Sequence, residues 1–321
     1  MNSKFYLILL LFALYSCTDE NKTEIEISKI PVDFKIERFD QIFGNAKPEE
    51  LADLKAEYPF MFSALMPDSL LVKRMNDSLQ NELTFEVGQT FQEFSVEKEE
   101  IKQLYQHLKY YDKTFNVPRV ITVTSDVDYR NKTIVTDTIN VIALDTYLGS
   151  DHRFYQGIQS YIKQNFNKSQ IVCDLADSYA KTYNFQSSRK SLLDEMIFAG
   201  KQLYFKDLMI PFKSDADKIG YSQSQLDWAF DNEAYIWGYF IEREMLYSTN
   251  SKLPNRFINP GPFSKFYLEL DNQSPGRIGQ FIGWQIVKSF IENNETSPLE
   301  VMQMDALTIF ERAKYKPKKT E

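Results

Sequence analysis

The segment 192–201 is apolar on nearly every side when it is drawn as a helix. Such a helix is stable only when other elements surround it, so the chain must build a core thick enough to bury it. Asp194 and Glu195 interrupt the segment, and a buried carboxylate requires hydrogen bonds, a cation or a metal ion. Glu233, further along the chain, also points toward an apolar helix face. We therefore predict that the three carboxylates converge inside the protein.

The spacing of apolar residues changes along the chain from helical to alternating and back. Helical spacing covers 45–115, a period of two covers 118–148, and helical spacing returns over 170–315. The alternating segment is short and contains the turn-forming pair Asn131-Lys132, so we expect a small antiparallel sheet. The pattern predicts an α+β fold, mostly helical, in which residues 31–321 form a single body.

A stripe of glycines marks the helix predicted over 275–293, for which Ser274 is a natural N-cap. The glycines start at Gly276 and recur at i+3 and i+7 on one face. Each costs about 1 kcal/mol relative to alanine in a helix, so the stripe indicates close approach of another backbone. We expect the 192–201 helix to be that partner. Two interpretations of Arg277 stay open: it neutralises one of the buried acids, or it lies in solvent beside a tightly packed helix pair.

The amino terminus has the features of an export signal. A positively charged start precedes an unbroken apolar run over 5–15, which fits a signal-peptide core and is too short to span a membrane. A small residue and then Cys17 follow, in a pattern similar to the bacterial lipobox. We predict that residues 1–16 are removed as a signal peptide and that Cys17 carries lipid such as palmitate, with a flexible tether completing 17–30. The alternative is an ordinary cleaved signal peptide with an unmodified cysteine.

The composition limits the classes of partner. A formal charge of −8 argues against nucleic acid as a partner and gives no general attraction to anionic lipid head groups. The lipid on Cys17 is therefore expected to hold the protein to the membrane. The only other cysteine, Cys173, lies in an apolar-periodic stretch and is predicted to be buried. The sequence indicates no cofactor.

The layout of a small sheet, a buried helix with an acidic pair and a later glutamate distantly resembles the gluzincin zinc peptidases. The resemblance implies that Asp194 and Phe198 occupy the two histidine positions, that Glu195 matches the general base and that Glu233 matches the third ligand. Phe198 offers no lone pair to a zinc ion, so no metal site is predicted. The body is therefore expected to be a pseudo-peptidase, with Asp194, Glu195 and Glu233 as candidate pocket acids and Arg277 as their possible partner.

A closer resemblance covers most of the mature chain and is to the gliding-motility lipoproteins called GldB. The matching phrases are Leu193–Lys201, Asn232–Trp237 and Ser274–Val287, of which the last is the most distinctive. The resemblance implies a bacterial cell-envelope lipoprotein required for gliding motility, at the outer membrane and facing the periplasm, with other envelope proteins of the gliding apparatus as partners. We prefer a non-catalytic scaffold. The alternative is an active envelope hydrolase that acts on peptide or cell wall through the buried carboxylates.

Overall fold

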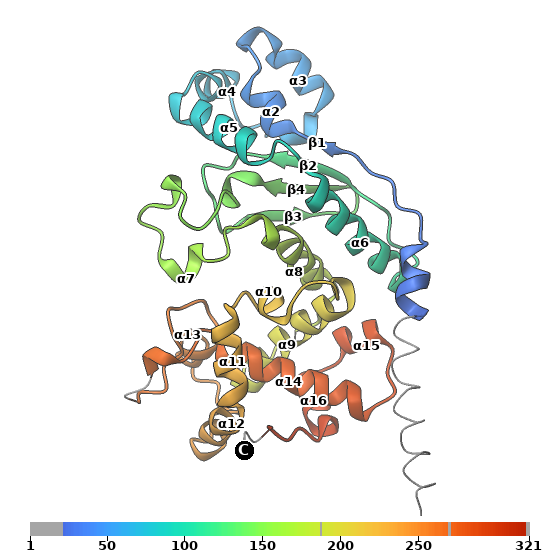
Figure 1. Cartoon of the computed structure of the whole chain (residues 1–321), viewed down its shortest axis with the longest axis vertical. Coiled ribbons are helices and arrows are strands. Elements are labelled where there is room, and N and C mark those ends of the chain that lie inside the picture. The colour runs from blue at the N-terminus through green and yellow to red at the C-terminus, as the bar shows by residue number, and fades with distance from the viewer. Residues whose placement is uncertain (1–21, 187, 269–270, 319–321) are drawn as a thin grey trace, which may run out of the picture.

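The computed structural model describes residues 22–318 apart from 187, 269 and 270. Most of these residues lie in helices, and a single four-stranded sheet combines one strand from the start of the described chain with three from residues 119–143 (Figure 1). The prediction of a mostly helical α+β fold is therefore confirmed. The predicted signal peptide and Cys17 lie outside the described residues.

Short helices precede the sheet and form one end of the molecule (Figure 1). The elements up to the first long strand are β1 (Ile36–Glu37), α2 (Phe39–Gly44), α3 (Leu51–Glu57), α4 (Asp68–Met75), α5 (Ser78–Thr90) and α6 (Ser95–Tyr111). The remaining strands are β2 (Arg119–Val123), β3 (Thr133–Val135) and β4 (Ile139–Ala143). The later helices are α7 (Ser160–Lys163), α8 (Ile171–Tyr183), α9 (Leu192–Met209), α10 (Asp215–Ile219), α11 (Gln223–Asp231), α12 (Glu233–Glu242), α13 (Leu253–Phe257), α14 (Ile278–Asn293), α15 (Pro298–Gln303) and α16 (Ala306–Ala313).

The sheet is mixed, with the strand order β1-β2-β4-β3. Strand β2 runs parallel to both β1 and β4, whereas β3 pairs antiparallel with β4. The prediction of an antiparallel sheet is wrong because the chain crosses from β2 to the far edge of the sheet before a hairpin returns it as β4. Thr136 closes this hairpin, since its hydroxyl accepts a hydrogen bond of 3.0 Å from the backbone N–H of Ile139.

Two large apolar cores meet at α9. In one core, α6 and α8 pack on the sheet face that carries Val120 and Ile142. In the other, α9 packs with the C-terminal helices, including α14 and α16. Met196 of α9 belongs to the second core and Phe205 of α9 to the first. Helix α9 is therefore buried on nearly every side, as its sequence predicts.

Helices α9 and α14 approach each other closely at two glycines. A Cβ atom on Gly200 would lie 2.7 Å from the backbone nitrogen of Trp284 and would overlap the carbonyl of Gly283. A Cβ atom on Gly283 would overlap the carbonyl of Met196. The prediction that the 192–201 helix is the close partner of the glycine-bearing helix is confirmed.

Helix α14 begins later than the sequence predicts. Its first residue is Ile278, whose N–H donates to the hydroxyl of Ser264, and Ser274 is not its N-cap. Gly276 precedes the helix and lies against Gly261, where a Cβ atom would overlap the Gly261 carbonyl. This contact and the left-handed backbone of Arg277, with φ of 63°, hold residues 275–277 in a turn.

The segment predicted as a flexible tether is helical over residues 22–28. Ile27 is 1% exposed, and the amide of Gln106 on α6 donates to the carbonyls of Ser28 and Ile30 at 2.9 and 3.0 Å. His107 places Nε2 at 3.2 Å from a carboxylate oxygen of Glu24. These contacts dock the segment on α6, so the tether prediction is wrong for residues 22–30. Cys173 is buried, as predicted.

Candidate functional site

Asp194 caps the helix on which it lies. It is the third residue of α9, where its N–H donates to the hydroxyl of Ser191 and its carboxylate accepts from the N–H of Ser191 at 3.0 Å. The guanidinium of Arg189 donates to both carboxylate oxygens at 3.0 to 3.1 Å. Burial alone would raise the pKa of Asp194, but the hydrogen bonds from Arg189 and Ser191 outweigh it and lower the pKa. The carboxylate is thus satisfied by its own helix terminus.

Glu195 lies beside this cap and is half-buried. The side-chain amide of Gln186 is 3.4 Å from one carboxylate oxygen of Glu195, and the ammonium of Lys190 is 3.9 Å away. Neither distance corresponds to a strong contact. Phe198, one turn along α9, is also half-buried, and its carbonyl accepts from the amide of Asn184.

Glu233 is the first residue of α12 and is 2% exposed. Its Oε1 accepts a hydrogen bond of 2.7 Å from the hydroxyl of Tyr315, whereas its buried Oε2 has no hydrogen-bond partner within the described part of the chain. Burial raises the pKa of Glu233.

The three candidate acids do not form one site. Asp194 contacts Arg189 and Ser191, Glu195 lies near Gln186, and Glu233 contacts Tyr315. Over residues 22–318, leaving aside the gaps named above, no group of three or more His, Cys, Asp and Glu side chains could hold a metal ion. The predicted convergence of the carboxylates is wrong, because Asp194 is bound at the start of its own helix and Glu233 contacts the C-terminal segment instead.

Arg277 does not reach these acids either. Its guanidinium donates to the carbonyl of Gly220 at 3.0 Å and lies 5.4 Å from the ring centre of Tyr221. The side chain is half-buried, so neither of the two interpretations from the sequence describes it. The turn at 275–277 directs it toward the loop that follows α10.

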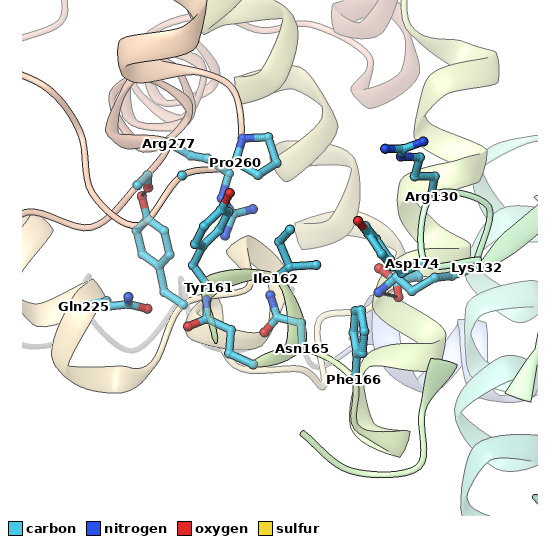
Figure 2. Close-up of a pocket in the computed structure, with 15 residues that line it drawn as sticks. Arg130, Lys132, Tyr161, Ile162, Asn165, Phe166, Asp174, Gln225, Pro260 and Arg277 are labelled. Carbon is cyan, nitrogen blue, oxygen red and sulfur yellow. Dashed lines mark hydrogen bonds and ion pairs between the residues drawn. The ribbon is translucent and has the colours of Figure 1, made fainter. Parts of the chain in front are cut away.

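Arg277 lines an open pocket of about 420 Å³, which we call the Arg277 pocket (Figure 2). Its walls come from segments far apart in the sequence: residues 129–132, residues 161–166, Asp174 of α8, residues 221–225, residues 260–261 and residues 276–277. Figure 2 shows Arg277, Tyr161 and Gln225 on one side and Arg130, Lys132 and Asp174 on the other. The volume is in the range that holds a small ligand.

Three side chains converge on the carbonyl oxygen of Gly220 at the base of the pocket. Gln164, Asn165 and Arg277 donate to it at 3.1, 3.0 and 3.0 Å. Gly220 has φ of 70°, and a Cβ atom there would lie 2.6 Å from the amide nitrogen of Asn165. The three donors tie the α7 segment, the end of α10 and the start of α14 to one point, which fixes this wall.

Charge in the pocket is mainly positive, although the whole chain is acidic. The lining contains three cations, Arg130, Lys132 and Arg277, and one carboxylate, Asp174. Asp174 pairs with Lys132 and also accepts a hydrogen bond of 2.8 Å from the hydroxyl of Tyr147. Its charge is therefore compensated, and the two arginines are left to act on a ligand.

The loop that carries Tyr129 and Arg130 is held from beneath by Asp145. This buried carboxylate accepts from the backbone N–H of Ser125 at 3.0 Å and of Val127 at 2.7 Å. Val127 has φ of 58°, a conformation that is strained for a β-branched residue. The surroundings of the loop thus hold it in a shape that its own sequence disfavours.

The family described as gliding motility protein GldB matches the chain over residues 20–317. The chain belongs to the GldB family. The prediction from the three sequence phrases is confirmed, and the protein is accordingly a cell-envelope lipoprotein involved in gliding motility. No curated protein and no solved structure matches the chain, so no comparison supports the resemblance to gluzincin peptidases. Across the described residues, no helix has the length and apolar character needed to span a bilayer.

The part of the chain that matches the GldB family includes the whole Arg277 pocket. Sequence reasoning selected Arg277 but missed Arg130, Lys132 and Tyr161. Lys132 was considered only as part of a turn. No local motif marks these residues, because the pocket is assembled from segments spread over residues 129–277. The available signal was weaker: basic and aromatic residues interleaved in two loops of an acidic chain.

Proposed function

We propose that this protein acts in gliding as a lipid-anchored, non-catalytic binding component of the cell envelope, attached through Cys17 to the outer membrane and facing the periplasm. Its partners are other envelope proteins of the gliding apparatus. The observation that supports a binding role over hydrolysis is the commitment of Asp194 to Arg189 and Ser191. A carboxylate that caps its own helix and pairs with an arginine is not available to activate water or hold a metal ion.

The competing function is hydrolysis by an envelope enzyme, and one observation favours it. Glu233 is buried with a raised pKa and one unpaired oxygen, which are properties of a general acid. The hydroxyl of Tyr315 occupies its other oxygen. If Glu233 is catalytic, the protein must lose its function when the carboxyl group of Glu233 is replaced by a group that cannot act as an acid.

Gliding assays with isosteric variants separate the two functions. For Glu195→Gln and Glu233→Gln, a binding component is expected to support gliding at the normal speed, because both amides keep the shape and acceptor oxygen of the native side chains. Protein amount in the envelope serves as the control for folding. Loss of gliding with normal amounts of Glu233→Gln protein would favour the hydrolase.

The anchor is tested by metabolic labelling with a fatty-acid analogue. The native protein should carry the label, and Cys17→Ala should not. Cys173→Ala is the matched control, because its thiol is buried and should not affect labelling. Label that persists on Cys17→Ala would exclude lipidation at this residue.

A further inference from the structure

We propose that the Arg277 pocket binds a small hydroxyl-rich ligand that bears carboxylate or phosphate groups, in other words an anionic sugar. One anionic group pairs with Arg277 and a second with Arg130 on the opposite wall. The proposal does not depend on the partners of the protein in gliding, since it concerns a cavity within one chain.

Arg277 is available to an anion and is held in place. Among the described residues, its guanidinium donates to one acceptor, the Gly220 carbonyl, and forms no ion pair with a carboxylate. Tyr221 lies against the guanidinium and donates its hydroxyl to the carbonyl of Gly276, which fixes the ring. A guanidinium has five N–H donors in a rigid plane, so the donors that remain can grip a carboxylate or phosphate in two places.

The opposite wall supplies the second charge. Arg130 is exposed, and among the described residues its guanidinium forms no hydrogen bond; the exposed carboxylate of Asp128 nearby interacts with it only through charge, which solvent screens. Lys132 beside it is bound to Asp174, which leaves Arg130 as the cation able to turn to a ligand. Because the two arginines lie on separate walls (Figure 2), a ligand with two anionic groups fits the pocket better than a single small ion.

The floor between the arginines suits hydroxyl groups. Gln164 and Asn165 use their amide nitrogens on Gly220, so their amide oxygens remain as acceptors. The half-buried ring of Tyr161 lies on the same side of the pocket as Arg277 in Figure 2. Amide acceptors, an aromatic ring and a planar cation together match the hydroxyl groups, the C–H face and the acid group of an anionic sugar.

Calorimetric titration of the full-length protein in detergent tests this with three probes: digalacturonate, glucose 1,6-bisphosphate and the neutral disaccharide lactose. At least one charged probe should bind more tightly than lactose, and which of the two binds identifies the carboxylate or the phosphate as the preferred group. Arg130→Gln should weaken that binding about tenfold to a hundredfold, the value of a charge-assisted hydrogen bond. Arg277→Gln should do the same if it folds.

Arg130→Gln is the decisive variant because its side chain holds no part of the fold. Arg243→Gln, an exposed arginine at the end of α12, is the matched control and should leave the affinity unchanged. The proposal is overturned if neither charged probe binds, if lactose binds as tightly, or if Arg130→Gln has the affinity of Arg243→Gln. Gliding measured on the same variants is a separate readout, so a failed binding test leaves the role in gliding standing.

Discussion

Replacing Gly283 by alanine is expected to push α9 and α14 apart and to destabilise the protein. The new Cβ atom would overlap the carbonyl carbon and oxygen of Met196 and would lie 3.1 Å from its Cα atom. Carbon atoms pack at about 3.5 to 4.0 Å, and the obstacle is backbone, which cannot rotate away as a side chain can. Overpacking of this kind costs about 1–3 kcal/mol or more, and the gain in helix propensity returns about 1 kcal/mol. Because the overlap is with backbone, the cost lies at the upper end of this range, and we expect a net loss of about 2 kcal/mol in the free energy of unfolding.

Urea denaturation followed by tryptophan fluorescence measures this loss, because Trp284 is fully buried next to the substituted residue. Gly238→Ala is the matched control. Gly238 also lies inside a helix, α12, but nothing is within 4 Å of its Cβ position, so this variant should gain about 0.5–1 kcal/mol. Gly200→Ala acts on the same contact, and the double variant with Gly283→Ala should cost less than the sum of the two. Equal stability of Gly283→Ala and Gly238→Ala would refute the close approach of the two helices.

Three further predictions concern buried charges. Lys201 is 2% exposed and donates to three backbone carbonyls, so Lys201→Met should lower the free energy of unfolding by about 3 kcal/mol. Burial lowers the pKa of Lys201 to about 8, so the native protein should gain stability as the pH rises from about 8 to about 10.5. The variant should lack this gain. Asp194→Asn should lower the free energy of unfolding by about 1–2 kcal/mol at neutral pH. The difference in stability between native protein and variant should vanish as the pH falls below about 4 and through the lowered pKa of Asp194. Urea denaturation midpoints measured over this pH range would show it. Glu233→Gln should be at least as stable as the native protein at neutral pH, because burial raises the pKa of Glu233 and disfavours its charged form. Below about pH 4.5 the two proteins should be equally stable. A large loss of stability in the variant at pH 7 would contradict this.

Amphipathic helices could be predicted from the sequence because their pattern is local. The start of α6 at Ser95 and the buried character of α9 both follow from apolar spacing. Apolar spacing over 222–248 predicts one helix, but the chain breaks at Asn232, whose amide donates back to the carbonyl of Trp228. Apolar spacing continues across the break, so periodicity alone gives no sign of it.

The sheet could be predicted only in part, since strand partners are chosen by tertiary contacts. Strand β1 has two residues, too few for any alternation to be visible. Parallel pairing of β2 with β4 depends on where the intervening chain crosses, which no short sequence pattern encodes.

The role of Asp194, in contrast, was readable from the sequence. Ser191 and Asp194 have the spacing of a capping box, a serine followed three residues later by an acidic side chain. An acidic residue in an apolar segment is often hydrogen-bonded to the backbone N–H groups at a helix start. Helix capping is therefore a simpler explanation of Asp194 than a metal site. Glu233 had no comparable signal, because its partner Tyr315 is far away in the sequence.

The Arg277 pocket also connects the two cores that α9 joins. On one wall, Lys132 lies 5.2 Å from the ring centre of Tyr147, which belongs to the core with the sheet. On the other wall, Tyr221 belongs to the core of the C-terminal helices. A ligand gripped by both walls links the cores at a second place, so it must raise the free energy of unfolding by RT ln(1 + [L]/Kd). Arg130→Gln should therefore leave the stability of the ligand-free protein unchanged and remove most of this increment at a fixed ligand concentration. A variant that lowered stability equally with and without ligand would show that Arg130 supports the fold and not the ligand.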